Sequence, residues 1–170
     1  MNNIEQSDLL FPHITTLPKD YESLFPPRGL PTGAKVTRLG PSPTGFIHLG
    51  NLYVAFVNER LAHQSGGLFY LRIEDTDQKR EVEGAIDAII SSLNYFGVVF
   101  DEGATVDEEI GKYGPYYQSR RAHIYQCYVK ELIRRGLAYP CFCTGEELEA
   151  IREEQEAKKE NPGYYGSWAK

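Results

Sequence analysis

The sequence has few cysteines and no long hydrophobic run. Its 170 residues include three cysteines, Cys127, Cys141 and Cys143, an odd and low number that fits a reducing cytoplasm better than a disulfide scaffold. No run of about 18 apolar residues occurs, so we predict no membrane span. The N-terminus carries Glu5 and Asp8 and has no basic region before an apolar core, so it does not resemble a secretory signal. We therefore expect a cytoplasmic protein.

The sequence also lacks an excess of positive charge. Its 18 Lys and Arg residues stand against 24 Asp and Glu residues, which gives a net charge of −6. No global basic field therefore attracts nucleic acid, and any such contact must come from a local patch. The length and the 41% hydrophobic content suit one domain plus part of a second unit.

Hydrophobic periodicity predicts an α/β fold. Residues 34–39 are expected to form a strand, 49–64 a helix that ends at Gly66-Gly67, and 68–73 a second strand buried on both faces. A strand, a helix and a strand in about 40 residues form a βαβ unit. Further helices are expected at 80–96, 119–135 and 146–159, a short third strand within 113–119, and an irregular acidic loop within 98–117.

A Pro/Gly-rich stretch, residues 36–51, joins the first strand to the helix that follows. Gly45 and Gly50 allow the backbone to approach a ligand closely. His48 and Gly50 lie where the helix begins, and free N–H groups and the helix dipole favour anions such as phosphate there. The stretch therefore predicts a phosphate-binding turn, although a single turn of this kind also occurs as an ordinary connection.

The residues His48-Leu49-Gly50-Asn51 are similar to the HIGH signature of class I aminoacyl-tRNA synthetases. Arg38, the run Pro41-Ser42-Pro43-Thr44-Gly45 and the run Arg72-Ile73-Glu74-Asp75-Thr76-Asp77 resemble the glutamyl-tRNA synthetase subfamily. The resemblance covers residues 36–166. It implies the N-terminal half of a Rossmann-like class I catalytic domain, with parallel strands and crossover helices, and the start of the insertion that binds the tRNA acceptor end.

The resemblance assigns roles at the expected cleft. It implies that His48, as the catalytic residue, binds ATP together with Gly50 and Asn51, and that Arg38, Ser42 and Glu74 hold glutamate. ATP brings its own Mg²⁺. A guanidinium at a strand end can clamp a carboxylate, and a carboxylate can bind an ammonium group. Arg38 can instead pair with Glu74 or Asp75, and His48 can be an ordinary turn histidine.

Residues 112–135 carry a local basic excess interleaved with five tyrosines, which can receive the acceptor strand of tRNA. Here we assign Arg120 and Arg121 to tRNA, and we assign Asp77 to the tRNA end of the cleft. The alternative is a solvated basic helix face with tyrosines in the core.

Cys141 and Cys143 stand where some members of the family bind zinc. Tyr164 matches a further ligand of that site, but Trp168 and Lys170 occupy the positions of the expected Cys and His. Two thiolates and a phenol do not complete a tetrahedral site. We therefore predict that no zinc binds and that these cysteines pack as small apolar groups.

We divide the chain into an extended N-terminal arm (1–33) that packs Leu10, Phe11, Leu24 and Phe25 on the domain or is disordered, an ATP- and amino-acid-binding half-domain (34–136) and the beginning of the acceptor-binding insertion (137–170). The family's second, lysine-containing signature is missing, so we expect an N-terminal piece with weak or no charging activity alone. The full-length enzyme is expected to be a monomer. Alternatives are a paralogue that glutamylates a modified tRNA base, the glutaminyl enzyme, and a non-catalytic tRNA- or partner-binding module.

Overall fold

Four strands form a mixed sheet in the computed structural model, which describes residues 1–165. β1 (Val36–Leu39), β2 (Leu68–Leu71) and β3 (Glu102–Ala104) run parallel, and β4 (Glu109–Ile110) pairs antiparallel with β3. The spatial order is β1-β2-β3-β4. The predicted α/β class is therefore confirmed, with β1, α3 and β2 as the predicted strand–helix–strand unit.

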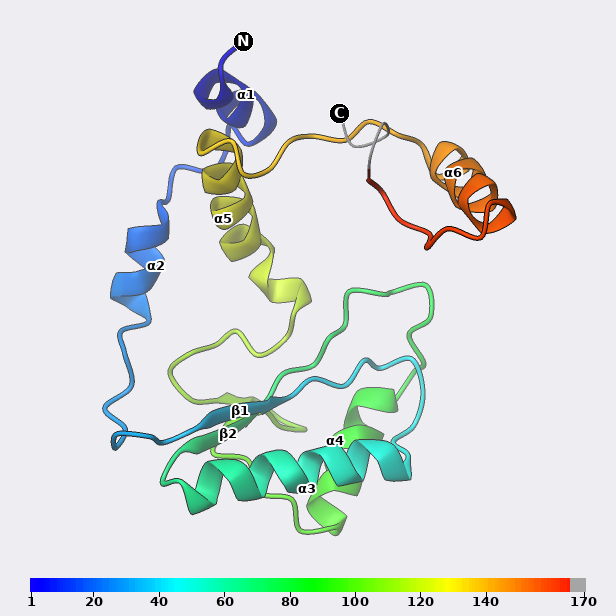
Figure 1. Cartoon of the computed structure of the whole chain (residues 1–170). Coiled ribbons are helices and arrows are strands. Elements are labelled where there is room, and N and C mark those ends of the chain that lie inside the picture. Colours follow the sequence, from blue (N-terminus) through cyan, green and yellow to red (C-terminus); the bar gives the residue numbers. More distant parts are fainter. Residues whose placement is uncertain (166–170) are drawn as a thin grey trace.

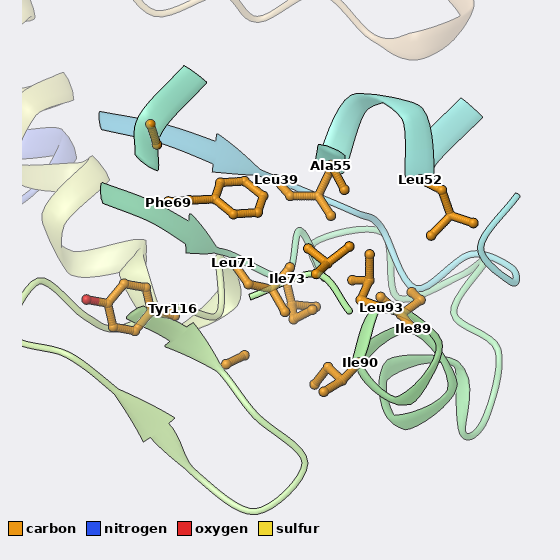
Figure 2. Packing of buried hydrophobic residues seen from close by; sticks show 13 residues of the cluster. Leu39, Leu52, Ala55, Phe69, Leu71, Ile73, Ile89, Ile90, Leu93 and Tyr116 are labelled. Atoms are coloured by element: carbon orange, nitrogen blue, oxygen red, sulfur yellow. The ribbon is translucent and has the colours of Figure 1, made fainter. Parts of the chain in front are cut away.

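Two helices cover one face of this sheet (Figure 1). α3 (Leu49–Gln64) connects β1 to β2, and α4 (Ala85–Tyr95) connects β2 to β3. Phe69 and Leu71 of β2 are fully buried against these helices, together with the residues labelled in Figure 2, among them Leu52, Ala55, Ile89 and Leu93. The apolar stripe predicted for the second of these helices is thus core.

The other face of β2 is only partly covered, because side chains alternate along a strand. Leu68 and Tyr70 are half-buried, and Arg72, just beyond the strand, points to the same side. The prediction that this strand is buried on both faces is therefore wrong for one face. A polar arginine and a tyrosine require partners there rather than a hydrophobic core.

The remaining helices are α1 (Asn3–Leu10), α2 (Pro18–Leu24), α5 (Ala122–Arg134), which follows the 3₁₀ turn η1 (Ser119–Arg121), and α6 (Gly145–Ala157). α1 and α2 both contact α5, and in Figure 1 these three helices lie beyond the face of the sheet opposite α3. Among the described residues, no helix has the length and apolar character that a membrane crossing requires.

Residues 1–33 are not simply extended, which corrects the sequence-based prediction. α1 begins with a capping box between Asn2 and Glu5, and α2 begins with Pro18 in its first turn, where a proline is tolerated. Ile14, only 2% exposed, anchors the segment, whereas Leu24, which we expected to pack, is 64% exposed. The prolines here lie at helix boundaries and do not prevent helices from forming.

Residues 98–117 are not irregular throughout, and Glu102 does not lie in a solvated loop. Glu102, Gly103 and Ala104 are all buried in β3. Gly103 has φ of 133°, and a Cβ atom there would lie 2.4 Å from the carbonyl oxygen of Leu71, so only glycine allows this close pairing. The strand expected within 113–119 is reduced to a single bridge between Tyr117 and Ile73.

The helix predicted at 80–96 begins later, at Ala85. The N–H of Val82 donates to the carbonyl oxygen of Pro43 at 2.9 Å, so residues before Gly84 are tied to the Pro/Gly-rich loop instead of continuing the helix. This contact fixes the start of α4 relative to that loop.

Candidate active site

The Pro/Gly-rich loop and the segment that follows β2 are joined by backbone hydrogen bonds. The N–H of Arg72 donates to the carbonyl oxygen of Leu39 at 3.0 Å, and the N–H of Glu74 donates to that of Pro41 at 2.9 Å. Both segments leave the sheet at the carboxyl ends of adjacent parallel strands, where ligands of open α/β sheets bind. The two sequence motifs therefore form one continuous surface.

Arg38 and Glu74 meet on this surface. Arg38 Nη1 lies 3.0 Å from Glu74 Oε1, and Arg72 Nη2 lies 3.2 Å from the same oxygen. The side chains of Arg38 and Glu74 are 37% and 28% exposed, so water reaches both. The Arg38–Glu74 ion pair, which the sequence analysis gave as an alternative, is therefore present. It also brings together two of the three residues that were assigned to glutamate binding.

The third, Ser42, lies between two buried prolines. Pro41 and Pro43 are buried and fix the backbone on both sides, while Ser42 itself is exposed. The hydroxyl is therefore carried on a rigid loop and faces solvent beside the carboxyl ends of β1 and β2.

His48 is the N-cap of α3. Its Nδ1 accepts a hydrogen bond from the N–H of Gly50 at 3.1 Å, and its own N–H donates to Asn51 Oδ1 at 3.2 Å. An imidazole nitrogen that accepts carries no proton in the neutral ring, so the proton is on Nε2. The cap thus leaves an exposed His48 with a donor nitrogen available to an anion.

The position of the His48 ring leaves no room for a side chain at Gly50. A Cβ atom at Gly50 would lie 2.9 Å from His48 Cε1 and 3.0 Å from Nδ1. Any larger residue would push the ring off its cap, so the glycine holds the histidine as well as leaving the helix start open.

Comparison with known proteins identifies the family. The model of the family described as tRNA synthetases class I (E and Q), catalytic domain, matches residues 35–169. The chain belongs to this family.

The similar proteins are longer than this chain. It is 65% identical over 164 residues to the glutamate–tRNA ligase of Acetivibrio thermocellus and 59% identical over 165 residues to that of Clostridium perfringens, which is 96% of this chain and 30% of each relative. A crystal structure of a glutamate tRNA ligase from Elizabethkingia meningosepticum in complex with its amino acid is 39% identical, with a TM-score of 0.66, over 78% of this chain and 26% of that one. The chain therefore spans about 30% of the length of the curated relatives.

The two aspartates that follow Glu74 in this motif, Asp75 and Asp77, contact other residues of the same chain. Asp75 accepts from the N–H of Ser119 at 2.8 Å and from its hydroxyl at 2.6 Å, and so fixes the start of η1. Asp77 pairs with Arg80 at 2.6 Å. Neither caps α4, which begins at Ala85. The partner of Asp75 is 44 residues away, and no local pattern indicates it.

Part of the basic segment proposed to receive tRNA contacts the N-terminal residues. Lys130 Nζ lies 2.8 Å from Asp8 and donates to the carbonyl oxygens of Phe11 and Ile14, and the side chain is 12% exposed. Tyr128 contacts the ring of Tyr21. Lys130 is therefore taken up by packing within the chain, so the basic tyrosine-rich patch is smaller than the sequence indicates.

Arg120 and Arg121 have different surroundings although they are neighbours in η1. Arg120 is 60% exposed, pairs with Glu109 and stacks over the ring of Tyr117. Arg121 turns inward, and its Nη1 donates to the carbonyl oxygen of Pro115 at 2.8 Å. Their assignment to tRNA stays a prediction, and only Arg120 is displayed on the surface.

Cys141, Cys143 and Tyr164 gather at one place. The hydroxyl of Tyr164 lies 3.4 Å from Cys141 Sγ and 3.8 Å from Cys143 Sγ. The hydrogen bond between Tyr164 and Cys141 lowers the pKa of the Cys141 thiol. Cys141 is exposed, so the prediction that the pair packs as apolar groups is wrong for this residue.

No group of three or more His, Cys, Asp or Glu side chains within residues 1–165 is arranged to hold a metal. The two positions on which the zinc argument depends, Trp168 and Lys170, lie outside the described residues. The prediction that zinc does not bind therefore stays a prediction.

Proposed function

We propose that this protein acts in the ATP-dependent attachment of glutamate to tRNA, through a glutamyl-adenylate. The observation that carries the proposal is the meeting of Arg38 and Glu74 at the ends of neighbouring strands, next to the loop that ends at His48. An amino acid carries both a carboxylate and an ammonium group, and this pair offers the two complementary charges. Membership of the family and the glutamate–tRNA ligase relatives support glutamate as the amino acid.

In the first step, an oxygen of the glutamate α-carboxylate attacks the α-phosphorus of ATP. A new O–P bond forms as the bond to the bridging oxygen breaks, and pyrophosphate leaves with the electron pair. Mg²⁺ enters with ATP as part of that substrate. Because both reactants are anions, the protein's task is to hold them in line and to stabilise charge.

Each residue of the loop has a role in holding ATP. His48 donates from Nε2 to phosphate oxygens as negative charge develops on them. Asn51 holds the backbone of His48 through the capping hydrogen bond. Gly50 keeps the helix start free of side chain, so that the adenosine can approach the backbone there.

The amino acid binds between the two strand ends. Arg38 and Ser42 bind a glutamate carboxylate. Glu74 uses Oε1 for the arginines, and we assign Oε2 to the substrate ammonium group. The ion pair in the protein without ligand preorganises both charges and keeps them hydrated until the substrate arrives.

In the second step, a ribose hydroxyl at the 3′ end of tRNA attacks the carbonyl carbon of the adenylate. The new ester C–O bond forms, the C–O bond to the phosphate breaks, and AMP leaves with the electron pair while the hydroxyl proton is released to water. Asp77, Arg120 and Arg121 are the residues we assign to the tRNA side. Because the chain spans about 30% of the length of its relatives, we propose that the 170-residue chain forms the adenylate site and transfers glutamate weakly or not at all.

The test is a pair of calorimetric titrations with non-hydrolysable glutamyl- and glutaminyl-adenylate analogues. The proposal predicts saturable heat with the glutamyl analogue and at least about tenfold weaker binding of the glutaminyl analogue. If neither analogue gives binding heat, the protein is a non-catalytic module instead. A parallel assay with radiolabelled glutamate, ATP and unmodified tRNA is expected to show little charging, and robust turnover would refute the weak transfer that we propose.

A further inference from the structure

A cavity lies on the face of the sheet opposite α3 and α4. Its volume is about 260 Å³, below the range of pockets that hold drug-sized ligands. Three arginines from distant parts of the chain line it: Arg28 from the N-terminal segment, Arg72 from the end of β2, and Arg121 from η1. Arg38, Ser42, His48 and Glu74 are not among its lining residues.

Two of the arginines that line this cavity each have a buried guanidinium nitrogen without a partner. Among residues 1–165, only three buried side-chain nitrogen or oxygen atoms make no hydrogen bond, and Arg72 Nε and Arg121 Nε are two of them. A guanidinium N–H only donates, so it is satisfied only by an acceptor. These unpaired donors show that the chain supplies too few acceptor oxygens to the arginines around the cavity.

The charges around the cavity favour an anion. Arg28 is matched by Glu102, with contacts of 2.5 and 2.8 Å. Arg72 shares the single carboxylate of Glu74 with Arg38. Arg121 has only a neutral carbonyl as hydrogen-bond acceptor among the described residues. Of the three lining arginines, only Arg28 therefore has a carboxylate that it does not share with another arginine, which leaves a local excess of positive charge in a chain whose net charge is −6.

The rest of the wall is largely aromatic. Phe25, Tyr70 and Tyr113 line the cavity, and the guanidinium of Arg28 lies 3.6 Å from the centre of the Tyr113 ring. The Tyr113 hydroxyl donates to the carbonyl oxygen of Pro26. Apolar walls lower the local dielectric and strengthen the attraction between the arginines and an anion.

We propose that this cavity binds a small phosphate anion, inorganic phosphate or pyrophosphate, at a site separate from the amino-acid and ATP surface. A phosphate presents several acceptor oxygens and up to two negative charges, which suits convergent guanidinium donors better than a singly charged carboxylate does. The cavity volume favours the free anion over a phosphate that carries a nucleoside. Arg72 contacts both this cavity and Glu74, so it connects the anion to the candidate amino-acid site.

The experiment is isothermal titration of the 170-residue protein with phosphate, pyrophosphate, acetate and AMP at constant ionic strength. Arg121→Gln removes a lining charge, and Arg120→Gln is the matched control, because Arg120 is the adjacent arginine of η1 and does not line the cavity. Val36→Glu is a second, independent variant that leaves all arginines in place. Val36 lines the cavity and is 45% exposed, so a carboxylate there can compete with the anion at little cost in packing, and Val36→Gln is its neutral control.

The proposal predicts saturable binding of phosphate or pyrophosphate, weakened at least about tenfold by Arg121→Gln and by Val36→Glu and less than about twofold by either control. Unchanged melting temperatures show that the variants fold. The proposal is overturned if neither anion binds saturably, if acetate binds as well as phosphate, or if AMP alone binds. Equal weakening by Arg120→Gln and Arg121→Gln also overturns it, because it indicates adventitious surface binding.

Discussion

Arg38 and Arg72 converge on one oxygen of Glu74, at 3.0 and 3.2 Å. The two arginines come from β1 and from the end of β2, so this oxygen marks the point where the two strand ends meet. A carboxylate held by two guanidiniums is kept in a fixed position. It can then receive a substrate ammonium group without first having to be ordered.

Replacement of Glu74 by glutamine tests this role. Glu74→Gln keeps the size of the side chain and removes its charge, so we expect the glutamyl-adenylate analogue to bind at least about tenfold more weakly. The free energy of unfolding should change by less than about 1 kcal/mol, because exposed ion pairs contribute little. Glu83→Gln, at an exposed position, is the control. Equal affinities of the wild type and Glu74→Gln would exclude Glu74 from the site.

The protonation of His48 can be read directly by ¹⁵N NMR of the imidazole. The hydrogen bond from Gly50 to Nδ1 predicts that the neutral ring carries its proton on Nε2. Gly50→Ala should displace the ring and change this pattern, because the added Cβ would lie 2.9 Å from Cε1. Gly45→Ala is the control, since a Cβ there meets nothing within 4 Å. Protonation on Nδ1 in the wild type would contradict the cap.

Glu102 should give the protein a measurable dependence of stability on pH. Burial raises the pKa of Glu102, but hydrogen bonds from Arg28 and Tyr116 outweigh it and hold the pKa below 4.5. Burial and the bond to Glu102 raise the pKa of Tyr116 to about 12, so it stays a donor near neutral pH. Because the pKa of Glu102 is lower in the folded state, its stabilisation is present above pH 4.5 and is lost as the pH falls through the lower value.

Urea unfolding of Glu102→Gln measures this contribution. We expect a loss of about 1–3 kcal/mol at neutral pH, since a hydrogen bond between charged partners is removed from a partly buried site. The difference from the wild type should shrink as the pH falls below 4.5. The control is the exposed Glu108→Gln. A difference that stays constant across this range would show that the charge of Glu102 is not responsible.

Ile14 tests the packing of the N-terminal segment on α5. Ile14→Ala should cost about 2–4 kcal/mol, because the side chain is 2% exposed and the cavity left behind would not fill. Leu24→Ala, at a position 64% exposed, should change stability by less than about 0.5 kcal/mol. Denaturant unfolding compares the two. Similar small losses for both would show that the segment does not pack as the structure has it.

Local signals account for the elements that the sequence predicts well. α3 spans Leu49–Gln64, as expected, because the loop before it and the glycines after it define both ends. The capping box of Thr144 and Glu147 likewise places the start of α6. These signals lie within a few residues of the boundary that they determine.

Long-range contacts account for what the sequence does not indicate. The segment Glu102-Gly103-Ala104 has low strand propensity, and it becomes β3 through pairing with β2 and through Arg28, 74 residues away. The contact of Asp75 with Ser119 and the burial of Lys130 also depend on distant partners. The Arg38–Glu74 contact could be anticipated, because Arg38 lies near the end of β1 and Glu74 follows the adjacent parallel strand β2, but its sharing with Arg72 could not.

The central claim is that the ends of β1 and β2 and the start of α3 form one site for glutamate joined to AMP. At 19.3 kDa the protein is small enough for chemical-shift mapping by NMR. Titration with the glutamyl-adenylate analogue should perturb the signals of Arg38, Ser42, His48, Gly50 and Glu74 together, with a single saturation curve. Shifts confined to α6 or to the N-terminal helices, with these five residues unchanged, would contradict the claim.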